Sequence, residues 1–134
     1  MFKHLAAWTL ALSVSGCAFA PTAQHPLASF VEIDPNGKTV RTLSFALTQQ
    51  PIETCISGDW KRAEPLNDRK RYTERSAYIR EGDSLEVLLV NTVCDGYDSY
   101  VGKLTGDRFL GQHVQYGLGF SKTLGTVSGS VPVP

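Results

Sequence analysis

The chain contains three cysteines, Cys17, Cys55 and Cys94, whose thiols are the side chains best able to form covalent bonds. An odd number of cysteines leaves one thiol over after a disulfide has formed. Two kinds of thiol chemistry are therefore predicted. One pair is oxidised, and the remaining cysteine has a separate role.

The first cysteine closes a segment with the layout of an export signal. Residues 1–4 are weakly basic and residues 5–14 carry no charge. Such a run is too short to cross a bilayer, since a spanning helix needs about 20 apolar residues. Residues 14–17, Val-Ser-Gly-Cys, resemble the lipobox of bacterial lipoproteins. This resemblance implies cleavage before Cys17 and attachment of acyl chains, such as palmitate, that tether the mature protein to a membrane.

The residue after the lipobox bears on the location. Ala18 stands where many Gram-negative lipoproteins retained in the inner membrane have aspartate. By that resemblance we expect a lipid-anchored protein on the periplasmic face of the outer membrane. The alternative is cleavage after a nearby small residue such as Ala20, which would remove Cys17. Loss of residues 1–16 removes Lys3 and changes the net charge from 0 to about −1, which predicts no nucleic-acid partner.

The mature chain is expected to be a tether followed by one domain. Residues 17–28 contain two prolines and small or polar residues, which are typical of a linker. Residues 29–134 have enough apolar side chains for a single core. In an oxidising periplasm Cys55 and Cys94 are expected to form a disulfide. The chain-entropy model gives such a bridge roughly 4 kcal/mol as an upper value.

The domain is predicted to be all-β, because short runs with a period of two alternate with turn residues. We expect hairpins around the turns at residues 34–37, 81–83 and 105–107. In the strand at residues 85–91, Leu85, Val87 and Leu89 should face the core, while Leu88 and Val90 indicate partial cover on the other side. The predicted strands cover residues 30–33, 39–47, 56–60, 77–80, 85–91, 100–104, 109–115 and 123–131.

About eight sequential strands favour an antiparallel meander. Closing the meander into a small barrel would remove its two free edges. Eight of the twelve glycines lie after residue 95, several within predicted strands, where they would allow tight bends. A two-sheet sandwich with the same strands is the alternative. Gly58-Asp59-Trp60 resembles the Gly-x-Trp signature of lipocalins and related small barrels, and this resemblance implies a barrel in which Trp60 points inward.

The domain offers few groups for catalysis. His113 is its only histidine, and a strand residue that faces water or a polar neighbour is the expected interpretation. Asp95 and Asp98 form a weak carboxylate pair, more typical of a turn than of a calcium site. No nucleophile elbow or phosphate-binding loop is present. The sequence therefore predicts no catalytic residue, no metal and no cofactor, and a protein that is not an enzyme.

The predicted connection at residues 61–75 is basic in a nearly neutral chain. The simpler interpretation is a solvated loop that keeps the barrel rim soluble. The other is a recognition loop for an acidic protein surface or an anionic glycan, in which Arg69, Lys70 and Arg71 supply charge and Tyr72 is an aromatic anchor.

Together these features predict a membrane-anchored envelope lipoprotein that acts as a binding module. A particular form is an inhibitor or immunity protein of a periplasmic hydrolase. The alternative is a lipocalin-like carrier of a small apolar ligand, because an eight-stranded barrel has room for side chains or for one small ligand.

Overall fold

The structure, a computed structural model, describes residues 24–72, 75–90 and 94–133. The expected signal peptide of residues 1–16, the lipidation site Cys17 and most of the expected tether lie outside this range. The described part of the chain contains no helix that is long and apolar enough to cross a membrane.

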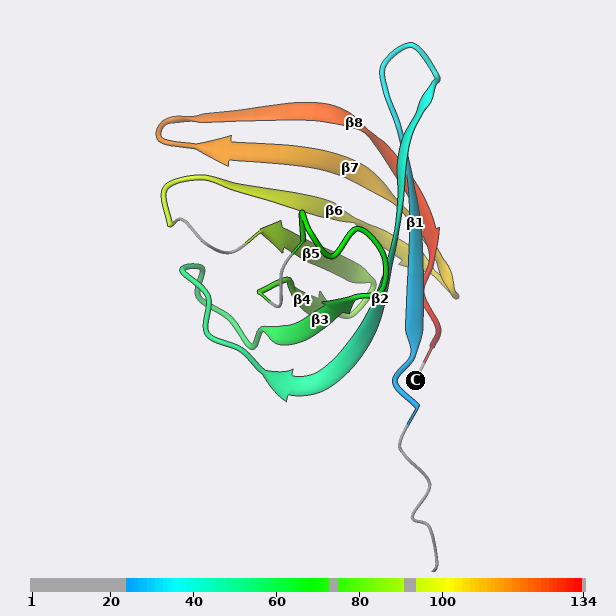
Figure 1. The fold of residues 1–134 in the computed structure, drawn as a ribbon, viewed down its shortest axis with the longest axis vertical. Helices are drawn as coiled ribbons and strands as arrows, with labels where there is room; N and C mark the ends of the chain where they lie inside the picture. The colour runs from blue at the N-terminus through cyan, green and yellow to red at the C-terminus, as the bar shows by residue number, and fades with distance from the viewer. Residues whose placement is uncertain (1–23, 73–74, 91–93, 134) are drawn as a thin grey trace, which may run out of the picture.

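The described residues form eight antiparallel strands that close into one barrel (Figure 1). Each strand pairs with its neighbour in sequence, and the last strand returns to pair with the first. This confirms the predicted all-β meander and its closure, and it excludes the two-sheet sandwich. The strands are β1 (Leu27–Ile33), β2 (Thr39–Pro51), β3 (Lys61–Pro65), β4 (Ala77–Glu81), β5 (Ser84–Val90), β6 (Tyr97–Thr105), β7 (Arg108–Gly117) and β8 (Phe120–Ser130).

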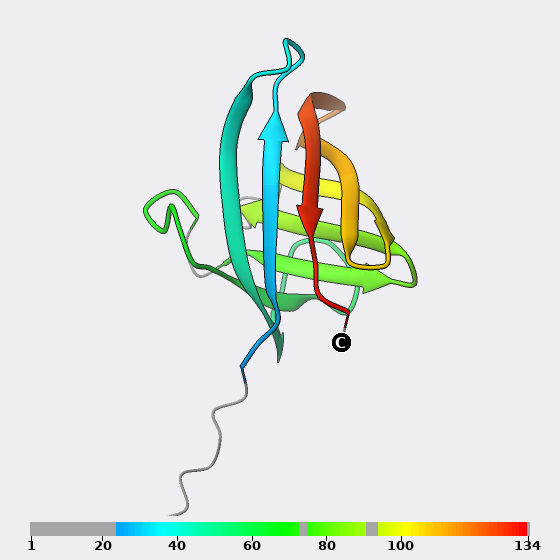
Figure 2. The same ribbon diagram turned by 90° about the vertical axis from the view of Figure 1, so that its right-hand side faces the viewer.

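The two ends of the strands have different neighbours, because successive strands run in opposite directions. The chain enters β1 from residues 24–26 at the end where β8 leaves toward the C-terminus, and we call this the tether end (Figure 2). The connections β1–β2, β3–β4, β5–β6 and β7–β8 lie at the opposite end, which we call the distal end.

The β1–β2 hairpin forms where the sequence predicts it. In its turn, Asp34 Oδ1 accepts hydrogen bonds from two backbone amides, both at 2.9 Å. Gly37 has a φ of 81°, a left-handed conformation that glycine adopts without strain. Strand β1 begins at Leu27, two residues before the predicted start of the domain, and Ala28 is already fully buried.

The third strand lies later in the chain than predicted. The sequence predicts a strand through Trp60, whereas β3 occupies Lys61–Pro65 and residues 52–60 form a loop outside the barrel wall. Gly58 has a φ of 136°, which interrupts an extended strand. Trp60 is buried, but it packs against the outer faces of β4 and β5 instead of pointing into the barrel. We call residues 52–60 the outer loop.

The half of the interior nearer the tether end is apolar and contains packed aromatic rings. The ring centroids of Phe30 and Phe109 lie 5.3 Å apart, and those of Phe30 and Phe45 lie 6.2 Å apart, both in edge-to-face contact. On β5, the predicted inward residues Leu85, Val87 and Leu89 join this core. Leu88 points the other way and is covered by the outer loop, as predicted. Val90, predicted on the same outer face, instead packs against the interior core, because the register shifts between Leu88 and Val90.

Two strand glycines let β6 and β7 lie close to the core. Gly102 pairs with Gly111 across these strands, and the ring of Phe109 covers both. A Cβ atom added to Gly102 would stand 2.3 Å from the carbonyl oxygen of Leu110 and 2.7 Å from the tip of the Phe109 ring. No side chain fits at this position, which agrees with the role predicted for strand glycines in a tightly curved wall.

Candidate functional site

The distal half of the barrel interior holds a cluster of polar side chains. They come from four strands and one connection and form what we call the polar cluster: Glu32 (β1), Arg41 (β2), Tyr72 (β3–β4 connection), Tyr100 (β6) and His113 (β7). Strand alternation explains the inward direction of the first two. Glu32 lies two residues after the core residue Phe30, and Arg41 lies two residues before the core residue Leu43.

Glu32 is the centre of the polar cluster. Its side chain is 2% exposed. Arg41 Nε lies 2.8 Å from Oε2, and the hydroxyl of Tyr100 donates to the same oxygen at 2.9 Å. His113 Nδ1 lies 2.9 Å from the other oxygen, Oε1. Three donors therefore compensate the cost of burying this carboxylate, and Arg41 balances its charge.

The two tyrosines of the polar cluster are held in the protonated form. Burial raises the pKa of Tyr100 far above its usual value, and the neighbouring charge of Glu32 raises it further. Burial also raises the pKa of Tyr72. Burial opposes the positive charge of Arg41, but the proximity of Tyr72 and Glu32 outweighs this effect and raises the pKa of the guanidinium. The guanidinium of Arg41 is thus paired with the carboxyl group of Glu32 inside the barrel.

The connection after β3 begins with a loop, residues 66–72, that is fastened to the barrel; we call it the basic loop. The side chain of Asn67 bonds to the backbone of β2 at Thr42 and Ser44, with both distances 2.8 Å. The backbone amides of Arg71 and Tyr72 donate to the carbonyl oxygen of Asp68, which closes a tight turn. The base of the loop is therefore held in one conformation.

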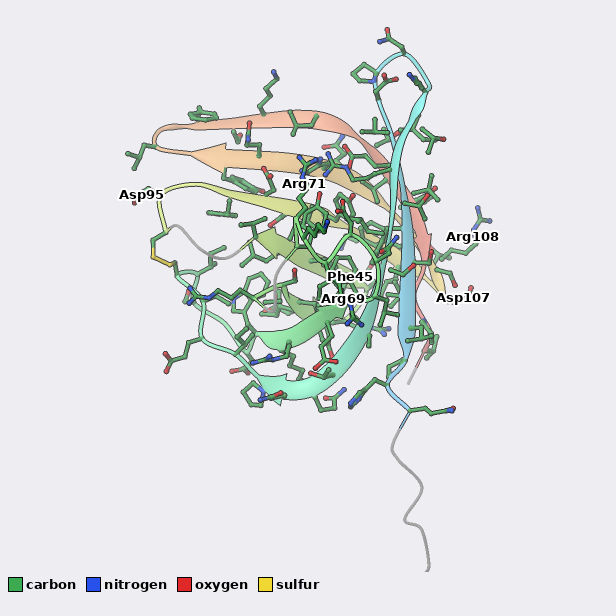
Figure 3. The ribbon with its side chains drawn as sticks, in the orientation of Figure 1. Phe45, Arg69, Arg71, Asp95, Asp107 and Arg108 are labelled. Carbon is green, nitrogen blue, oxygen red and sulfur yellow. A yellow bond between two sulfur atoms is a disulfide. The ribbon has the colours of Figure 1, made fainter. Side chains whose placement is uncertain are left out.

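The structure separates the four residues of the predicted recognition surface. Arg69, Lys70 and Arg71 are exposed. Figure 3 labels Arg69 and Arg71 on this loop. The sequence predicts that Tyr72 is an aromatic anchor for a partner, but its side chain is only 1% exposed and is not available at the surface. Its hydroxyl accepts a hydrogen bond from Arg41 Nη1 inside the barrel, and its ring lies in the core. Tyr72 anchors the basic loop to the barrel, and the charged residues beside it remain at the surface.

His113 lies inside the barrel and does not face water. It is 1% exposed, and its Nδ1 contacts Glu32, which agrees with the alternative of a polar neighbour. Its Nε2 faces Asp98 Oδ1 at 3.9 Å, beyond hydrogen-bond distance, and neither atom has another described partner. A buried polar atom without a hydrogen bond costs about 1–3 kcal/mol of folding free energy. This pair of atoms therefore lowers the stability of the fold.

Sequence reasoning did not single out Glu32, Arg41 or Tyr100. The available signal was their position, because the first two fall on the inward face of amphipathic strands. A charged residue on such a face must find a partner inside the barrel. In sequence, Glu32 is 81 residues from His113 and 68 residues from Tyr100. Only the closed barrel brings these side chains together.

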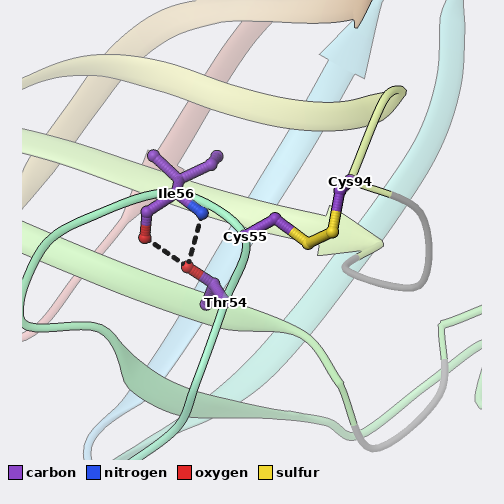
Figure 4. The surroundings of a disulfide bond; sticks show 4 residues. All are labelled: Thr54, Cys55, Ile56 and Cys94. Carbon is purple, nitrogen blue, oxygen red and sulfur yellow. Dashed lines mark hydrogen bonds between the residues drawn. A yellow bond between two sulfur atoms is a disulfide. The ribbon is translucent and has the colours of Figure 1, made fainter.

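The predicted disulfide is present. Cys55 of the outer loop is bonded to Cys94 of the β5–β6 connection, with 5.2 Å between the Cα atoms (Figure 4). Next to the bond, Thr54 Oγ1 donates to the carbonyl oxygen of Ile56 at 2.7 Å and accepts from its amide at 3.2 Å. The outer loop is thereby held over β4 and β5, where it covers their outer apolar residues.

Within the described ranges, no three or more His, Cys, Asp or Glu side chains are arranged to hold one metal ion. Comparison of the chain with models of known families, with curated proteins and with solved structures gives no match.

Proposed function

We propose that this protein is an envelope lipoprotein, anchored through Cys17 to the periplasmic face of the outer membrane, that binds another protein. The proposal takes it to be a binding module and not an enzyme. Its particular form is an inhibitor or immunity protein of a periplasmic hydrolase. The observation that carries the proposal is the basic loop, in which Arg69, Lys70 and Arg71 are exposed while Tyr72 is buried.

A loop of this construction is suited to binding. Its base is fixed by Asn67 and its end by Tyr72, so little backbone freedom is left to be lost when a partner arrives. Three adjacent cations on a fixed turn attract an acidic surface and orient it during association. The β3–β4 connection also lies at the opposite end of the strands from the tether, so the anchor leaves it accessible.

The carrier of an apolar ligand is the weaker alternative. Such a carrier needs interior space, and a barrel of eight strands has little beyond what side chains fill. Here the rings of Phe30, Phe45 and Phe109 occupy the half nearer the tether end, and the polar cluster occupies the distal half. These features support a function at the outer surface of the barrel.

The test compares two triple variants of the mature protein in affinity capture from an envelope extract. The first variant is Arg69→Ala, Lys70→Ala, Arg71→Ala. The control is Lys38→Ala, Arg108→Ala, Lys122→Ala, which removes the same charge from exposed positions elsewhere. We expect the wild type and the control to capture the same protein partner, and the first variant to lose it.

The captured partner should also dissociate as the salt concentration rises, because exposed charges are screened. Capture that is equal for both triple variants would remove the basic loop from the proposal. No specific protein captured by the wild type would contradict the binding function itself.

A further inference from the structure

A second surface feature is the opening of the barrel at the tether end, which we call the mouth. It is an open pocket with a volume of about 300 Å³. Its apolar lining comes from the interior core: Leu47, Tyr78, Leu85 and Val131. Pro26, at which the chain enters the barrel, also lines it. The mouth therefore lies at the end of the barrel from which the tether leaves.

Two cations lie at the rim of the mouth because of strand alternation. Lys61 is two residues before the inward residue Ala63, and Arg80 is two residues after the inward residue Tyr78. Their printed hydrogen bonds go to neutral oxygens, a side-chain amide at 2.6 Å from the amine of Lys61 and a backbone carbonyl at 3.3 Å from Arg80 Nε. Among the described residues, neither cation forms an ion pair with a carboxylate.

The acidic side chains at this end do not compensate the two cations. The described lining of the mouth contains no aspartate or glutamate. Glu81 follows Arg80 on β4, so it points the other way and lines a separate depression on the barrel wall. Asp83 is paired with Lys103 at 2.9 Å. The mouth is therefore a local positive site in a chain whose mature net charge is about −1.

The proposed anchor brings this end of the barrel close to a bilayer. Pro26 follows Cys17 by nine residues, and nine residues span at most about 32 Å. Leu27 and Val133 come directly after the lining residues Pro26 and Pro132, and they are 58% and 61% exposed. Cations beside exposed apolar side chains suit the interface of an anionic membrane.

We infer that the mouth binds the phosphate headgroup of an anionic phospholipid that remains in the bilayer. The phosphate accepts hydrogen bonds from Lys61 and Arg80, and Leu27 and Val133 lie at the level of the headgroups. An open pocket suits a group presented by a surface, because free small ligands are usually bound in pockets that enclose most of them. The inference rests on the proposed anchor, which supplies the membrane. It also sets the direction of the barrel, since the basic loop then points away from the bilayer.

The test uses the full mature chain, residues 17–134, produced without acyl chains, so that the anchor contributes nothing to binding. The probes are vesicles of phosphatidylcholine alone and vesicles of phosphatidylcholine and phosphatidylglycerol in equal parts. Sedimentation measures the bound fraction. We expect the chain to bind the anionic vesicles more tightly than the neutral vesicles, and this binding should weaken as salt is added.

Two double variants locate the binding site. Lys61→Gln, Arg80→Gln should bind the anionic vesicles about 25-fold more weakly, because each cation at an anionic surface contributes about fivefold. The control is Lys38→Gln, Lys122→Gln, which removes the same charge from exposed positions at the distal end and should bind like the wild type. Equal binding by the two double variants would overturn the inference, and so would equal binding of the wild type to both kinds of vesicle.

A spin-labelled phosphatidylglycerol identifies the end of the barrel that contacts the lipid. We expect it to broaden the methyl NMR signals of Leu27 and Val133 and to spare those of Leu118, which is 78% exposed at the distal end. Broadening of Leu118 alone would overturn the inference. These outcomes are independent of the anchor, because the tested chain carries no acyl group, whereas the anchor itself is tested by lipid attachment at Cys17.

Discussion

Three side chains converge on the carboxyl group of Glu32 inside the barrel. Arg41, Tyr100 and His113 each contribute one contact within 3 Å. Removing one partner from a buried ion pair is far more costly than never having formed the pair, because the other charge remains without compensation. The side chain of Arg41 is 19% exposed, so water can recover a part of this cost.

The first prediction concerns this carboxylate. Glu32→Gln should lower the free energy of unfolding by about 3 kcal/mol, since the amide cannot balance Arg41 and presents a donor to other donors. Urea denaturation followed by circular dichroism would measure the change. Glu64→Gln, at an exposed position on β3, is the control and should stay within about 0.5 kcal/mol of the wild type. A similar small effect for both variants would show that the polar cluster contributes little to stability.

The second prediction concerns alkaline pH. Burial raises the pKa of Tyr100, of Tyr72 and of Tyr78 above the value of 10.0 for a free tyrosine. A group with a raised pKa in the folded state gives its full stability below the pKa of the unfolded state and loses it as the pH rises beyond that value. The free energy of unfolding should therefore decline above about pH 10.

Phenolate absorbance measured along the same titration tests this mechanism. Ionisation of the buried tyrosines should coincide with unfolding instead of preceding it. Tyr100→Phe should be less stable at neutral pH, because Glu32 loses a donor, but its stability should fall less steeply in alkali. Phenolate formation that is complete before any unfolding would contradict the assigned burial.

The sequence predicts which side chains point into the barrel better than it predicts which of these side chains contact one another. The alternation of β5 correctly predicts Leu85, Val87 and Leu89 as inward residues. The same alternation would have placed Glu32 inward, but it carries no information on the strand across the barrel. The inward direction of Tyr72 was not predictable, because it lies in a connection with no period, and its contact with Arg41 depends on how that connection folds back.

Among the strands and loops, the outer loop shows why periodicity alone is ambiguous. Ile56 and Trp60 alternate with polar residues as they would in a strand, yet they pack on the outer face of the barrel. Alternation states only that one face is buried, and a loop lying on a wall can satisfy it as well as a strand can. The hairpins were predictable because residues such as Asp34 and Gly37 have direct roles in their turns.

The third prediction concerns the bond that holds the outer loop. The two cysteines are 39 residues apart in sequence, and chain entropy assigns such a bridge at most roughly 4 kcal/mol. Cys55→Ser, Cys94→Ser should therefore unfold at a clearly lower urea concentration than the oxidised wild type. The fluorescence of Trp60 should shift to longer wavelength before the barrel unfolds, because the loop that buries it is released.

Two controls make this result specific. A reducing agent should reproduce the effect in the wild type and should have no effect on the double variant. An oxidised wild type with the same unfolding midpoint as the double variant would show that the disulfide does not stabilise the fold. A free-thiol titration that finds both cysteines reduced in protein isolated from the periplasm would contradict the pairing in the cell.

The molecule as a whole has an apolar half and a polar half along the barrel. The rings lie toward the tether end, and Glu32 with its partners lies toward the distal end, close to the connection that carries the basic loop. Tyr72 links the basic loop to this interior through its contact with Arg41. The buried network therefore holds the end of the basic loop in place, which is a structural role for the polar half of the barrel.

The last prediction concerns the membrane anchor, on which the location of the basic loop and the mouth depends. Acyl chains at Cys17 would hold the protein stably at a bilayer, since two or more chains are needed for lasting attachment. Wild-type protein from cells grown with radiolabelled palmitate should be labelled and should sediment with outer membranes. Cys17→Ser should be unlabelled, whereas Cys55→Ser, Cys94→Ser should keep the label, because it removes two thiols but leaves the lipobox intact. Label retained by Cys17→Ser, or wild-type protein released unlabelled into the medium, would refute the anchor and leave the barrel as a freely diffusing domain.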